Sequence, residues 1–81
     1  MLQDSSAIRY YQKLTDALAD LQQRGYRFHE LRLYIDGYTA SLHHAGALAP
    51  HQAYRLEEEA LRFLRDPSNF ELPEPEPQSD A

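Results

Sequence analysis

Two glycines divide the chain into segments of helical length, and this division limits the folds that the sequence can adopt. Gly25 and Gly46 each follow a segment in which apolar residues recur every three or four positions, and Pro50 opens a third such segment. Glycine readily takes the left-handed conformation that ends a helix, and proline suits the first turn of one. The pattern predicts helices over about residues 6–24, 29–44 and 50–65.

Each predicted helix carries one apolar face, and the three faces predict a shared core. The expected core residues are Ala7, Tyr11, Leu14, Leu18 and Leu21, then Leu31, Tyr34, Ile35, Tyr38, Leu42 and Ala45, and finally Ala53, Leu56, Ala60, Phe63 and Leu64. Short connections place consecutive helices antiparallel. We therefore expect an all-α fold, a small three-helix antiparallel bundle over residues 1–72, with Phe28 and Leu48 of the connectors packed back onto it.

Charge is distributed unevenly along the chain. Up to residue 66, eight basic residues against nine acidic ones give −1, and four acidic residues beyond it give −4. Residues 73–81 are rich in Pro and Glu and contain no large apolar residue, so we expect a disordered acidic tail there. Phe70 and Leu72, just before that tail, are expected to fold back on the bundle.

The residue types argue against most catalytic and metal-binding chemistry. The chain has no Cys, no Gly-rich phosphate loop, and four His, of which the adjacent His43 and His44 would point about 100° apart on a helix. The acidic run Glu57–Glu59 on the third predicted helix would repel phosphate. We expect a protein that is not an enzyme and that has no cofactor, no metal site and no nucleic-acid partner.

No apolar run has the length of a signal sequence or of a membrane span, which needs about 20 residues. The absence of Cys fits a reducing compartment. We therefore expect a soluble cytoplasmic protein that is not exported.

The middle predicted helix carries a second, narrower strip of apolar and small residues opposite its core face. Gly37 within it costs about 1 kcal/mol relative to Ala in a helix, a cost that close approach of another backbone would offset. Alternatively, a middle helix touches two neighbours and simply tolerates small residues. The predicted partner surface comprises this strip and two residues on a flank of the third helix: Leu33, Gly37, Ala40, His44, Tyr54 and Leu61.

Several short motifs recur in one known family: YQKLTD at residues 11–16, RGYR at 24–27, RLEEE at 55–59 and RDPSNF at 65–70. On these motifs the chain, over roughly residues 1–71, resembles a family of small cyanobacterial proteins of unknown function. The resemblance implies a cyanobacterial cytoplasmic source, and it assigns no activity and no site residue.

The leading hypothesis is a non-enzymatic protein–protein interaction module that self-associates, as in a homodimer, or docks on a larger assembly. The alternative is a helical bundle that binds or senses a small ligand, with His43, His44 and tyrosine side chains lining a pocket. A nucleic-acid-binding protein is the third and weakest hypothesis.

Overall fold

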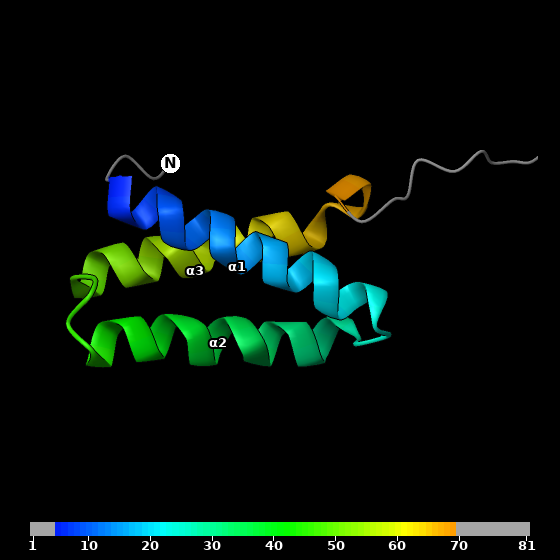
Figure 1. Ribbon diagram of the computed structural model, residues 1–81, viewed down its shortest axis with the longest axis horizontal. Coiled ribbons are helices and arrows are strands. Elements are labelled where there is room, and N and C mark those ends of the chain that lie inside the picture. The colour runs from blue at the N-terminus through cyan, green and yellow to red at the C-terminus, as the bar shows by residue number, and fades with distance from the viewer. Residues whose placement is uncertain (1–4, 70–81) are drawn as a thin grey trace, which may run out of the picture.

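A computed structural model describes residues 5–69, and these residues form three α-helices followed by a short 3₁₀ turn (Figure 1). The elements are α1 (Ser5–Gln23), α2 (Phe28–His44), α3 (Pro50–Arg65) and η1 (Pro67–Asn69). No strand occurs in this part of the chain. The predicted all-α three-helix bundle is confirmed. The predictions of a disordered tail over 73–81 and of a return of Phe70 and Leu72 to the bundle fall outside the described residues.

Glycine ends α1 and α2 in the same way. Gly25 and Gly46 have φ angles of 99° and 75°, in the left-handed region that other residues rarely adopt. After α1, the amide of Gly25 donates to the carbonyl of Gln22 at 3.0 Å, and the amide of Tyr26 donates to the carbonyl of Leu21 at 3.2 Å. This pair of bonds is the Schellman motif, and the same pattern follows α2.

The N-termini of α2 and α3 are capped by a side chain from within the first turn. The carboxylate of Glu30 accepts a hydrogen bond from the backbone N–H of Arg27 at 2.8 Å. The side chain of Gln52 accepts one from the N–H of Ala49 at 2.9 Å, and Pro50 occupies the first turn of α3. Each bond satisfies an amide that has no partner within the helix, although neither cap residue is a strong capping type.

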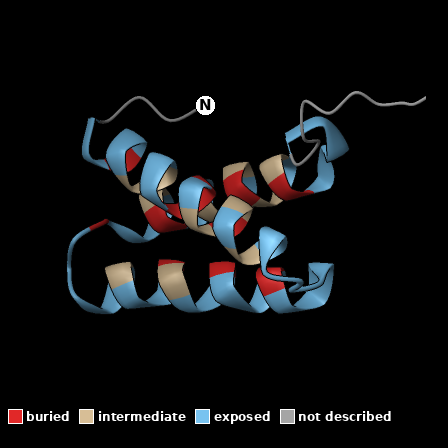
Figure 2. Cartoon of the chain, turned by 45° about the vertical axis from the view of Figure 1, so that its right-hand side comes forward, coloured by how far each residue is buried: buried red, intermediate tan, exposed pale blue. Residues whose placement is uncertain are grey.

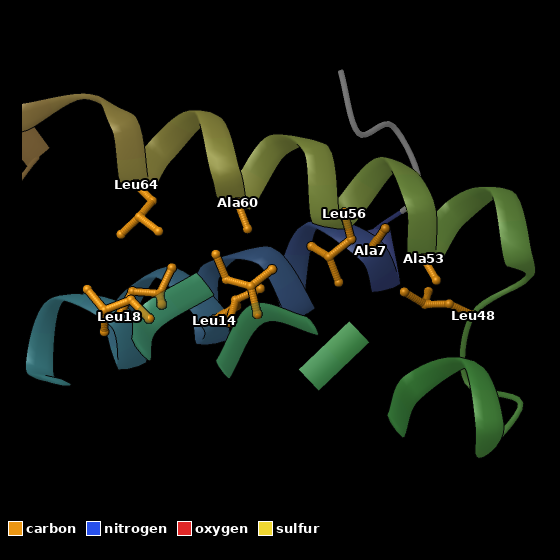
Figure 3. Packing of buried hydrophobic residues seen from close by; sticks show 10 residues of the cluster. Ala7, Leu14, Leu18, Leu48, Ala53, Leu56, Ala60 and Leu64 are labelled. Carbon is orange, nitrogen blue, oxygen red and sulfur yellow. The ribbon is translucent and has the colours of Figure 1, made fainter. Parts of the chain in front are cut away.

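The core lies between the three helices, and α3 packs against both of the others (Figure 3). Its buried apolar residues are Ala7, Leu14, Leu18, Leu31, Ile35, Leu48, Ala53, Leu56, Ala60 and Leu64. The prediction that Leu48 packs back onto the bundle is confirmed. Thr39 is also buried, although its type did not suggest a core position; its hydroxyl donates to the carbonyl of Ile35 at 3.0 Å, so burial leaves no unpaired donor.

Three expectations about individual residues are wrong. Phe28 is 48% exposed because it is the first residue of α2, at the end of the bundle, where neighbouring helices cover only part of its ring. Tyr34 is 38% exposed because it lies at the edge of the core face. Ala45 is exposed because α2 has already ended at His44.

Within residues 5–69, no helix combines the length and the apolar character that crossing a membrane would require.

Candidate interaction surface

The outer face of α2 is exposed along its whole length, and Figure 2 shows it in pale blue on the side away from the other helices. The buried residues Leu31, Ile35 and Thr39 fix the opposite, inner face. We call the outer residues the α2 strip: Leu33, Gly37, Ala40 and His44, all of them exposed.

Leu33 is the large apolar member of the α2 strip, and 67% of it is exposed. Gly37 follows one turn later, and a Cβ added there would meet no atom within 4 Å. No contact among residues 5–69 therefore requires glycine at this position, although glycine costs about 1 kcal/mol in a helix. The α2 strip thus combines an exposed leucine with a glycine that intramolecular packing does not explain.

The two α3 residues of the predicted partner surface, Tyr54 and Leu61, differ in their surroundings. Tyr54 is 68% exposed and lines a groove of about 410 Å³ between α2 and α3, together with Ala40 of the α2 strip. Leu61 is partly buried against the core cluster. The fold thus brings Tyr54 to the edge of the α2 strip, whereas Leu61 contributes mainly to the core.

A pair of carboxyl groups lies in the same groove, and sequence reasoning did not identify it. Asp36 of α2 and Glu57 of α3 both line the groove, and the two carboxyl groups interact there. Burial raises the pKa of Glu57; the interaction with Asp36 raises it further, and Arg32 opposes the shift. The two residues are far apart in sequence, and only the antiparallel packing of α2 on α3 brings them together.

Histidine does not assemble a metal site in the described part of the chain, where no three His, Cys, Asp or Glu residues gather in a way that could hold an ion. The rings of His43 and His44 lie 5.7 Å apart between centroids and are tilted by 42°. His43 lines the groove beside Asp36, whereas His44 belongs to the α2 strip.

A second groove, of about 490 Å³, lies at the end of the bundle where α1 passes into α2. We call it the end groove; its lining includes Tyr26, Arg27, Phe28, His29, Leu31 and Leu64. The two aromatic residues are each about half exposed, at 46% for Tyr26 and 48% for Phe28. The sequence of the connector between α1 and α2 did not indicate this groove. The walls of the groove come from residues 22–31 and from Leu64 of α3, which are distant in sequence.

These features define a small all-α protein whose middle helix exposes an apolar and small-residue strip. The chain belongs to the family of unknown function DUF6761, whose model matches residues 1–81. This membership confirms the predicted resemblance to a family without an assigned function. Comparisons with curated proteins and with solved structures gave no match.

Proposed function

We propose that this protein is a non-enzymatic interaction module that binds another protein chain through the α2 strip, with Tyr54 at the edge of the contact. The observation that carries the proposal is Gly37, which is exposed in the middle of α2 and where, among the described residues, an added Cβ would meet nothing within 4 Å. A glycine at this position lets a second helix approach closely, and Leu33 beside it supplies apolar area for burial.

The partner that fits this surface best is a second copy of the chain. When two α2 helices cross antiparallel with a two-fold axis at Gly37, Leu33 meets Ser41 of the second copy and Glu30 meets His44 of the second copy. The acidic residue near the start of α2 then faces an imidazole near its end, and the two helix dipoles oppose each other. A domain of this size buries too little surface to be very stable alone, so association also contributes stability.

The test is the mass of the protein in solution, measured by light scattering at micromolar concentration. We expect a dimer for the wild type, a monomer for Leu33→Lys, and a dimer for the control Gln12→Lys, which adds the same charge at an exposed position of α1. A wild-type monomer would exclude the second copy as the partner. In that case the wild type and Leu33→Lys are compared for capture of a larger assembly. Loss of capture in Leu33→Lys would support the α2 strip as the binding surface, and unchanged capture would exclude it.

The alternative function is that of a bundle that binds or senses a small ligand. The observation that favours it is the groove between α2 and α3, where His43 and Tyr54 lie beside the carboxyl pair of Asp36 and Glu57. A cationic ligand would suit the carboxylates and the tyrosine ring. Amide NMR shifts confined to these residues on titration with small amines would support this function, and a flat titration would exclude it.

We also propose a cyanobacterial source and a cytoplasmic location. The motif resemblance supports the source, and the absence of Cys from all 81 residues fits a reducing compartment. Fractionation of cells that produce the tagged protein tests the location, and recovery outside the cytoplasm would contradict it.

A further inference from the structure

The end groove is an apolar surface that the described residues leave uncovered. Leu31 and Leu64 are almost fully buried beneath it, whereas the rings of Tyr26 and Phe28 are about half exposed. Burying two half-exposed aromatic rings is favourable, because apolar area removed from water contributes about 25 cal/mol per Å². The basic side chain of Arg27 also lines the groove, so an occupant that combines apolar and acidic residues suits it.

The last described element, η1, lies at this same end of the bundle (Figure 1). After α3 the chain turns back on itself, because the side-chain amide of Asn69 donates to the carbonyl of Phe63 at 2.9 Å. The hydroxyl of Ser68 also donates to the Asp66 carboxylate at 2.7 Å. Asn69 is therefore held against the last turn of α3, which also contains Leu64 of the end groove.

The residue types of the segment 70–81, apolar and acidic, suit the lining of the end groove, and the apolar ones come nearest to α3. Its large apolar residues, Phe70 and Leu72, come first, and its acidic residues begin between them at Glu71 and continue with Glu74. The first three residues of an extended segment span about 10 Å, so both apolar side chains stay close to the end of α3. An acidic segment beside Arg27 adds charge complementarity.

We propose that residues 70–74 occupy the end groove of their own molecule, with Phe70 and Leu72 against the rings of Tyr26 and Phe28 and with Glu71 or Glu74 near Arg27. This contact is separate from the α2 strip and does not depend on the proposed function. It joins the C-terminal segment to the connection between α1 and α2, which is more than 40 residues away in sequence.

The test compares amide NMR spectra of the full-length protein. The double variant Phe70→Ser with Leu72→Ser is expected to shift the signals of Tyr26 and Phe28. The control variant Pro75→Ser with Pro77→Ser leaves both signals in place. Shifts near Leu64 do not count, because that residue is close to the variants along the chain. Unchanged signals of Tyr26 and Phe28 in the double variant would overturn the proposal.

A mixing experiment separates a contact within one molecule from a contact between two. Because the chain has no Cys, Ser79→Cys provides a single position for a nitroxide spin label. In a ¹⁵N chain that carries this nitroxide, we expect the signals of Tyr26 and Phe28 to broaden more than they do in the same chain with Phe70→Ser and Leu72→Ser. Equal broadening in these two chains would overturn the proposal. A second sample mixes ¹⁵N chains that carry no nitroxide with ¹⁴N chains that carry it, and broadening there equal to that of the first sample would also overturn the proposal.

Discussion

At the scale of single residues, Gly37 and Glu57 each carry a cost that the isolated molecule does not recover. Gly37 gives up helix stability in the middle of α2, and no neighbouring atom occupies the space where a side chain would be. Glu57 lies in a partly buried position beside a second carboxyl group, and both its burial and that group disfavour its charged form. Both residues therefore lead to predictions in which a substitution stabilises the fold.

For Gly37→Ala we expect the free energy of unfolding to rise by about 1 kcal/mol, because alanine is the better helix former and its methyl group meets nothing. Urea denaturation at low protein concentration measures this change. In the same variant, association through the α2 strip should weaken, since the methyl group holds a second helix away. A variant that gains stability and associates as strongly as the wild type would show that Gly37 does not lie in the contact.

For Glu57→Gln we expect a gain in stability at neutral pH of less than about 1 kcal/mol, the range of charge interactions at partly exposed positions. The pKa of Glu57 is raised in the folded protein, so its contribution to stability is full below the ordinary value of 4.5 and is lost as the pH rises through the raised pKa. Glutamine does not titrate, and its side-chain amide is a neutral donor beside the Asp36 carboxylate. The difference in free energy of unfolding between Glu57→Gln and the wild type should therefore increase as the pH rises through this range.

Urea denaturation over a series of acidic to neutral pH values measures that difference. The control is Glu58→Gln, which removes the same charge from an exposed neighbouring position of α3. Parallel pH profiles for Glu57→Gln and the wild type would contradict the effect assigned to the carboxyl pair.

At the scale of elements, the helix ends determine where the chain reverses. Both reversals use a glycine with positive φ and the same pair of backbone hydrogen bonds, and the helix that follows is capped by its own first turn. Local chemistry therefore determines where α1 and α2 end. The connections are short, so consecutive helices run antiparallel, and α3 packs against both of the others.

For Gly46→Ala we expect the free energy of unfolding to fall by about 1–3 kcal/mol, because alanine resists the left-handed conformation required after α2. Space is not the cause, since a Cβ at Gly46 would meet no atom within 4 Å. Ala47→Gly, one residue later, is the matched control and should change stability much less. Thermal unfolding followed by circular dichroism distinguishes the two variants.

At the scale of the whole molecule, the described residues form a three-helix bundle in which α3 lies against both other helices. Within residues 5–69 the core contains ten buried apolar residues, all small or aliphatic. Three of the six tyrosines line the edges of this core: Tyr10, Tyr11 and Tyr38 pack against it from partly buried positions. A small core with much exposed helix surface makes stability sensitive to association.

We therefore expect the midpoint of thermal unfolding to rise with protein concentration, because a dimer stabilises the folded state by mass action. Calorimetry over a hundredfold range of protein concentration measures the slope of this midpoint against concentration. Leu33→Lys should remove the slope, and Gln12→Lys should keep it. A midpoint independent of concentration in the wild type would contradict pairing between copies.

Most of the architecture followed from the sequence by itself, because helix periodicity, glycine and proline act locally. The predicted helices lie within one residue of those observed, and Leu14, Ile35 and Leu56 were correctly placed in the core. The exposure of Leu33 and Gly37 followed from the same periodicity. Tertiary packing decided what depends on two helices at once: the pairing of Asp36 with Glu57 and the incomplete cover over Phe28. Periodicity assigns a side chain to a face of its own helix, whereas the register and the end of the neighbouring helix determine what that side chain meets.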